Sequence, residues 1–219
     1  MILLTRPQKL SSQIAKDLAK KNILSIIQPL FSIVKIENIQ PIKIEIQAIL
    51  ITSSSAIFAL EKMAIKKDTL ILVVGKKTAI EVRGLGYSNI YHANNSAASL
   101  FDLALAKTSK NNGLVLYLSG KNITLDLADK LQNNGFEARK VIAYETKEAG
   151  EFSKKTIDEI KNKNISEIWF YSQNTLRIFH KLLKKHNLLG YLSEVEITCL
   201  SVKIAKLAHE MNFLRTKII

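Results

Sequence analysis

Hydroxyl side chains are concentrated at one turn of this 219-residue sequence. The segment ILITSSSAIFAL, residues 49–60, passes from an apolar run into consecutive hydroxyl residues and then into a helix-like pattern. A phosphate loop of the form GxxxxGK[S/T] would explain them, but the sequence has no such motif. The turn therefore indicates a different anion or no ligand at all, and its candidate binding residues are Thr52, Ser53, Ser54 and Ser55.

Other polar clusters occupy equivalent places, after an apolar run and before a helix-like segment. The first N–H groups of a helix are unpaired and its dipole favours negative charge, so carboxylates suit such turns. Ser, Thr and Asn are also the ordinary N-caps, so any one turn has a purely structural explanation. Several such turns together favour a ligand, and they add the candidates Thr78, Ser119, Gly120, Lys121, Ser172, Asn174 and Thr175.

The common catalytic and metal motifs are missing from the sequence. GxSxG, HExxH and CxxC do not occur, and the four histidines show no partner spacing. The single cysteine, Cys199, lies in an apolar run, which argues against a disulfide scaffold and against a metal cluster. Any chemistry is therefore expected from hydroxyls, backbone amides and a phenol.

The formal net charge of +13 raises the question of a nucleic-acid partner. The basic residues are mostly lysines scattered along the chain, whereas arginine is the residue that reads bases and forks onto phosphates. No nucleic-acid partner is expected, although the positive field would attract a polyanionic small molecule. No segment approaches the roughly 18 apolar residues of a membrane span, and the first charge comes early. These features predict a soluble, cytoplasmic protein without a membrane partner.

Apolar runs of strand length alternate with segments of helical period, which predicts a parallel α/β protein. Pro7 is expected in the first turn of the first helix, Asn95 and Ser96 at the cap of the fourth, and Gly135 after the fifth. The expected strands are 2–5, 23–27, 48–52, 70–74, 114–118, 138–144, 167–171 and 195–199, and the expected helices are 8–21, 55–64, 76–84, 97–108, 123–134, 174–186 and 202–211.

Two extended segments interrupt this alternation, around residues 33–39 and 141–148. If they pair as a two-stranded linker, the chain leaves its first domain, builds a second and returns. The sequence therefore predicts two similar parallel-sheet α/β domains, the first of them discontinuous. Its predicted limits are 1–32 plus 149–219 for the first domain and 40–140 for the second.

An internal repeat supports two similar halves. TSSSAI, residues 52–57, aligns with YSQNTL, residues 171–176, and each places a polar turn between a strand and a helix. Duplicated α/β halves bind ligands at the carboxyl ends of their strands, where the polar turns fall.

The ordered set of motifs resembles the uroporphyrinogen-III synthase family. The matching pieces are ILLTRP, LITSSSA, VVGKKTA, LYLSGK followed by DLADKLQNNGF, VIAYET and WFYSQNTLRIF, which cover nearly the whole chain in the family's order. The resemblance implies two α/β domains joined by a two-stranded ladder. It also implies an enzyme without metal or organic cofactor that cyclises the polycarboxylate hydroxymethylbilane. A monomer is expected.

Individual residues acquire roles through this resemblance. Tyr144 in VIAYET matches the family's tyrosine proposed to assist loss of the substrate hydroxyl, while a strand-end tyrosine packing on a neighbour is the structural alternative. Arg6 is a candidate carboxylate ligand, or it fixes the first turn. Ser201 is a further candidate substrate-binding residue, although its turn departs from the family, which commonly has a glycine-led turn there. The rival function is a two-domain α/β module that binds an anionic small molecule without turnover.

Overall fold

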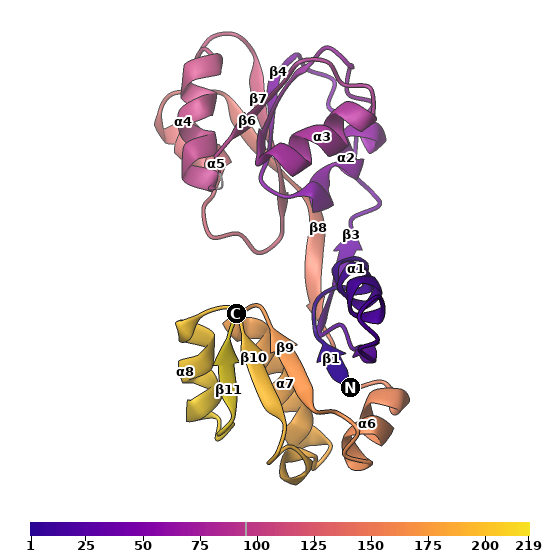
Figure 1. The fold of residues 1–219 in the computed structure, drawn as a ribbon. Helices are drawn as coiled ribbons and strands as arrows, with labels where there is room; N and C mark the ends of the chain where they lie inside the picture. The colour runs from indigo at the N-terminus through magenta and orange to yellow at the C-terminus, as the bar shows by residue number, and fades with distance from the viewer. Residues whose placement is uncertain (95) are drawn as a thin grey trace. The chain divides into compact units, whose positions relative to one another are not determined.

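The computed structural model describes residues 1–94 and 96–219, and its contacts divide them into two compact units (Figure 1). The first unit contains Met1–Ser32 and Lys147–Ile219, and the second contains Ile33–Thr146. The first unit is therefore built from both ends of the chain, which confirms the predicted discontinuity. The finer domain limits, 1–32 plus 149–219 and 40–140, stay a prediction.

The first unit has a five-stranded sheet in which all neighbouring strands are parallel. The strand order is β11-β10-β9-β1-β2, so β1 from the start of the chain lies between β2 and β9. Parallel neighbours need a crossover segment, and helices supply it here. The strands are β1 (Ile2–Leu4), β2 (Ser25–Ile27), β9 (Glu167–Phe170), β10 (Glu196–Cys199) and β11 (Thr216–Ile218).

Helices cover both faces of this sheet. One face packs on α7 and α8, with Phe179 of α7 touching Phe152 and Phe170 edge to face at centroid distances of 5.2 and 5.3 Å. The other face packs on α1 through a smaller apolar cluster that includes Leu4 and Leu18. The helices are α1 (Gln8–Ala19), α6 (Lys154–Lys161), α7 (Gln173–Lys185) and α8 (Val202–Glu210), with a 3₁₀ turn η2 (Leu189–Tyr191).

The second unit has a six-stranded sheet in the order β3-β8-β7-β4-β5-β6. The strands β4 to β8 pair in parallel, and β3 lies beside β8. The chain passes from one unit to the other within β3 and again within β8. The strands are β3 (Phe31–Lys35), β4 (Ile46–Ile51), β5 (Leu70–Val74), β6 (Ile90–Ala93), β7 (Leu114–Gly120) and β8 (Ala138–Glu148).

Both faces of this second sheet are buried. In β4, Ile49 and Ile51 pack on one face with α2 and α3, while Ala48 and Leu50 pack on the other with α4 and α5. We call these the α2/α3 face and the α4/α5 face. Burial on both sides explains why β4, β5 and β7 read as continuous apolar runs. The helical elements are η1 (Ser54–Ala56), α2 (Phe58–Lys62), α3 (Lys76–Gly84), α4 (Ala97–Lys107) and α5 (Leu127–Asn133).

The fold class predicted from the sequence is confirmed, and no helix in residues 1–94 and 96–219 is long and apolar enough to cross a membrane. The sequence prediction missed two strands, one α-helix and the 3₁₀ turn η2. The strands β6 and β11 lie at sheet edges and α6 is a short polar helix, so none carries a strong apolar signal.

Helix boundaries also differ from those predicted. The helix expected over 55–64 is divided into η1 and the five-residue α2, and the helix expected from 123 begins after Asp126, whose carboxylate accepts from the N–H of Ala128. Pro7 precedes the first helical residue, and Ser96 caps α4 through the N–H of Ser99. Asn95, also expected at that cap, lies outside the described residues.

A polar network lies on the face of the first sheet that packs on α1. Glu167 of β9 accepts hydrogen bonds from the indole N–H of Trp169 at 2.6 Å and from the hydroxyl of Thr198, and its carboxylate lies 3.1 Å from the ammonium of Lys217. Burial opposes ionisation of Glu167, but these donors outweigh it and hold the pKa of the carboxyl below its ordinary value. The ionised carboxylate therefore links β9, β10 and β11.

We expect this network to make the stability of the protein depend on pH. A carboxyl whose pKa is lowered by folding stabilises the folded state above its unfolded pKa of about 4.3, and this contribution is lost as the pH falls through the folded pKa. Glu167→Gln should lower the free energy of unfolding at pH 7 by on the order of 1 kcal/mol, and the difference from wild type should shrink below about pH 4. Urea unfolding across this pH range measures it.

The matched control is Glu194→Gln, because Glu194 forms an ion pair with Arg215 at 3.0 Å while remaining highly exposed. Exposed ion pairs contribute little to stability, so the free energy of unfolding of this variant should match that of wild type at each pH. The proposed linkage would be contradicted if the free energies of unfolding of wild type and Glu167→Gln differed by the same amount at every pH.

Candidate functional site

The predicted site residues lie where strands of the two sheets end. In the second unit, the turns after β4, β5 and β7 follow parallel strands and so share one edge of that sheet. In the first unit, the segments after β1, β9 and β10 likewise share one edge. Each edge carries hydroxyl groups and helix N-termini.

The hydroxyl turn after β4 is partly committed to internal hydrogen bonds. The hydroxyl of Thr52 lies 3.2 Å from the phenol of Tyr117, which is fully buried, and burial raises the pKa of Tyr117. The hydroxyl of Ser53 accepts from the N–H of Ser55 at 3.3 Å and caps η1. The hydroxyls of Ser54 and Ser55 form no hydrogen bond with another described residue. These two are the groups that remain available to a ligand at this turn.

The turn after β5 offers backbone rather than side-chain donors. Gly75 precedes α3 with a φ of 79°, a left-handed conformation that favours glycine, and it has no side chain to cap the helix. Lys76 and Lys77 are exposed in the first turn, and Thr78 is nearly buried. The uncapped N-terminus and the two ammonium groups together favour an anion.

The turn after β7 brings several predicted residues into contact with β8. The Ser119 hydroxyl is buried and donates to the carbonyl of Gly120 at 3.1 Å. The N–H of Lys121 donates to the carbonyl of Tyr144 at 2.8 Å, and its ammonium lies 3.4 Å from Glu145. Gly120 pairs directly with Tyr144, whose ring lies against it. The half-buried phenol of Tyr144 is therefore held at the end of β7.

In the first unit, Arg6 is stacked on an aromatic ring. Its guanidinium lies 4.4 Å from the ring centroid of Tyr171, a cation–π contact that joins the segments after β1 and β9. Burial raises the pKa of Tyr171, although the neighbouring Arg6 charge opposes the increase. Sequence reasoning missed Tyr171, and its position directly before the polar turn was the available signal.

The two helices that follow β9 and β10 begin differently. Ser172 caps α7, because its hydroxyl accepts from the N–H of Thr175 at 3.2 Å and lies 2.7 Å from the Thr175 hydroxyl. Asn174 is exposed in the first turn. Ser201 has the extended backbone of an N-cap residue, but its side chain makes no capping bond. The side chain of Gln173 donates to the Lys203 carbonyl at 3.0 Å and links the two helix starts.

Metal and thiol chemistry find little support in the described residues. No three His, Cys, Asp or Glu side chains within 1–94 and 96–219 gather as metal ligands. Cys199 is buried, and burial raises the pKa of its thiol to about 11, which leaves it protonated and unreactive near pH 7.

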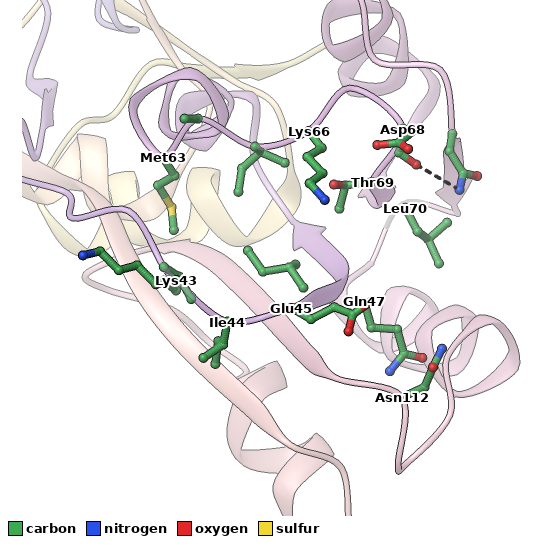
Figure 2. Close-up of a pocket in the computed structure, with 15 residues that line it drawn as sticks. Lys43, Ile44, Glu45, Gln47, Met63, Lys66, Asp68, Thr69, Leu70 and Asn112 are labelled. Carbon is green, nitrogen blue, oxygen red and sulfur yellow. Dashed lines mark hydrogen bonds between the residues drawn. The ribbon is translucent and has the colours of Figure 1, made fainter.

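A pocket of about 670 Å³ lies at the opposite edge of the second sheet (Figure 2). It is formed at the amino ends of β4 and β5, and Figure 2 shows Lys66, Asp68 and Thr69 together at one end of it. None of the residues predicted from the sequence lines this pocket. Ligands of parallel α/β sheets bind at the carboxyl ends of the strands, so the turns described above remain the stronger candidate.

Comparison with known families decides the assignment. The family model of uroporphyrinogen-III synthase HemD matches residues 12–216, nearly the whole chain. The chain belongs to the uroporphyrinogen-III synthase family. Membership confirms the resemblance drawn from the motifs, while the roles of single residues stay predictions.

Solved structures of uroporphyrinogen-III synthases share the fold. The enzyme from Helicobacter pylori superimposes with a TM-score of 0.59 at 17% identity, covering 99% of this chain and 91% of the other. A mutant enzyme from the extremely thermophilic bacterium Thermus thermophilus gives a TM-score of 0.53 at 12% identity, covering 100% and 92%. No curated protein sequence matches the chain. At such low identities the likeness concerns the fold alone.

Ser172 caps α7 through its hydroxyl, whereas Ser201 makes no capping bond at α8. This difference allows a test of which hydroxyls act as caps. Ser172→Ala removes a capping bond and should lower the free energy of unfolding by about 1 kcal/mol. Ser201→Ala removes no such bond and should lower it by at most a few tenths of a kcal/mol. Urea denaturation of both variants measures the difference, and equal losses would show that Ser201 also caps its helix in solution.

Proposed function

We propose that the protein is a uroporphyrinogen-III synthase, which cyclises hydroxymethylbilane to uroporphyrinogen III with inversion of the last pyrrole ring. The observation that carries this proposal is the placement of Tyr144 against Gly120, at the carboxyl end of β7, within a chain that belongs to the family over residues 12–216. The phenol is a hydrogen-bond donor at the edge where parallel α/β sheets hold their ligands.

The chemistry of the two sheet edges suits this substrate. Hydroxymethylbilane carries acetate and propionate carboxylates along its length, and helix N-termini accept carboxylates through backbone N–H groups. The uncapped starts of α3 and α8, the lysines at 76 and 77, and the free hydroxyls of Ser54 and Ser55 are the proposed contacts. Arg6, Asn174 and Lys121 are further proposed carboxylate ligands, and the net charge of +13 favours a polyanion in general.

The proposed reaction begins with cleavage of the C–O bond of the terminal hydroxymethyl group. Tyr144 acts as general acid and transfers its phenol proton to the departing oxygen, which leaves as water, and a carbocation stays on the first pyrrole ring. The last pyrrole attacks through its substituted carbon and gives a spiro intermediate. That intermediate breaks and recloses with the last ring inverted, and a proton is lost to restore aromaticity.

Geometry is the main demand on the protein. The unassisted chain closes without inversion to the type I isomer, so the substrate must be held folded with the disfavoured carbon near the cation. Many separate carboxylate contacts can impose that conformation. We further propose that the protein works as a cytoplasmic monomer and needs neither metal nor organic cofactor.

The decisive assay supplies freshly made hydroxymethylbilane and separates the oxidised products by isomer. We expect an excess of type III over type I, with no loss of rate when chelators are present. A folded protein whose product ratio equals that of the enzyme-free control would overturn the assignment. Binding without turnover would then favour the anion-binding module.

Tyr144→Phe tests the role of the phenol, because it keeps the ring and removes the donor. If the hydroxyl assists departure of water, kcat should fall roughly ten- to a hundredfold while the free energy of unfolding changes little. Tyr191→Phe is the control, because Tyr191 is an exposed tyrosine of η2 in the first unit. Wild-type turnover in Tyr144→Phe would show that Tyr144 is a packing residue.

A further inference from the structure

The pairing of β7 with β8 is irregular at the proposed catalytic tyrosine. Ser119 pairs with Ile142, but the next residue, Gly120, pairs with Tyr144, so Ala143 is the extra residue of a β-bulge. The carbonyl of Ala143 turns to the other neighbour and accepts from the N–H of Ile36 at 2.8 Å. The carbonyl of Tyr144 accepts from the N–H of Lys121 at 2.8 Å. Both residues of the bulge are therefore held by hydrogen bonds.

The bulge changes the face to which Tyr144 points. Side chains alternate along a strand, and Val141 and Ala143 both pack on the α2/α3 face. Without the bulge, Tyr144 would point to the opposite face. Its ring instead packs on the α2/α3 face as well. A bulge that redirects one side chain in this way is a recurrent feature beside active sites.

Gly120 supplies the space that this orientation needs. Leu116 and Leu118 of β7 pack on the α2/α3 face, and alternation places position 120 on the same face. A Cβ atom at Gly120 would lie 2.8 Å from Cε2 and Cζ of Tyr144 and 3.0 Å from its phenol oxygen. Side-chain carbons essentially never approach so closely. The ring of Tyr144 therefore occupies the space that any larger residue would fill.

The backbone conformation does not explain why residue 120 is glycine. Gly75, Gly86, Gly113 and Gly135 have positive φ values that favour glycine, but Gly120 is not among them. Gly120 lies within a paired strand, where glycine weakens the structure and marks a bulge or a close approach. The close approach of the Tyr144 ring is thus the physical reason for glycine at this position.

We propose that Gly120, together with the bulge at Ala143, is a positioning residue that fixes the phenol oxygen of Tyr144 for the reaction. This proposal rests on the proposed function and concerns the same site. Gly120 acts through Tyr144, because the clashing atoms belong to the hydroxyl end of the ring. Restoring an ordinary contact of 3.4 Å would shift that end by at least about 0.6 Å. Shifts on the order of 1 Å can reduce turnover about a hundredfold.

The first test compares Gly120→Ala with Gly84→Ala. A Cβ at Gly84, in α3, would meet nothing within 4 Å, so that variant should keep wild-type turnover. Gly120→Ala should lower kcat about tenfold or more with little change in KM, because carboxylate contacts elsewhere hold the substrate. Equal kcat in both variants would overturn the proposal.

A double-mutant cycle separates positioning from a general effect on structure. If Gly120 acts only by placing the phenol, Gly120→Ala should not reduce kcat further once Tyr144→Phe has removed the hydroxyl. Independent, multiplicative losses would show that Gly120 serves another purpose and would overturn the proposal. The free energy of unfolding of each variant shows whether kcat follows stability instead.

Tyrosine ring NMR gives a readout that needs no turnover. In protein labelled with ¹³C in its tyrosine rings, the Tyr144 signals are those lost in Tyr144→Phe. They should show contacts to the Gly120 α-protons in wild type, and they should shift in Gly120→Ala but not in Gly84→Ala. Missing contacts in wild type would overturn the proposal even if Gly120→Ala fails to fold. If the contacts are present but wild type yields no type III excess, the proposed function fails and the positioning role in this reaction fails with it.

Discussion

Parallel strand pairing is the constraint on which this structure depends. Each parallel pair needs a crossover, and the helices that supply it pack on the sheet faces and bury the strands. The same connectivity brings the carboxyl ends of the parallel strands, and the helix starts that follow them, to one edge of each sheet. Hydroxyl groups and unpaired N–H groups gather there because of topology, without any contiguous motif in the sequence.

The proposed carboxylate contacts use backbone donors and therefore make little demand on side-chain identity. A helix N-terminus offers its N–H groups whatever side chains the first turn carries. Ser201, for example, makes no capping bond and leaves the start of α8 uncapped. Tyr144 differs in kind, since no backbone group can replace a phenol.

The sequence predicted the buried part of the fold well, whereas the local geometry around the candidate site residues could not be predicted from it. Strands β4, β5 and β7 were visible because burial on both faces leaves continuous apolar runs. Edge strands β6 and β11 and the polar helix α6 lack that signal. The bulge at Ala143 adds one residue without any change in composition, so VIAYET does not show which way its tyrosine points. Contacts between distant segments, such as Arg6 with Tyr171 and Thr52 with Tyr117, likewise appear only in the structure.

The position of β1 inside the first sheet has a consequence for synthesis of the chain. Leu3 of β1 pairs with Ile26 on one side and with Ile168 on the other, so this interior strand leaves the ribosome long before its neighbour β9. At about 5–20 residues per second, the time between synthesis of Ile26 and synthesis of Ile168 is roughly 7–30 s. All of Ile33–Thr146 emerges in that time and can pack as a unit while β1, α1 and β2 still lack most of their core. Apolar surface on this early segment is thus exposed longest, which makes it the part of the nascent chain most open to aggregation or to capture by chaperones.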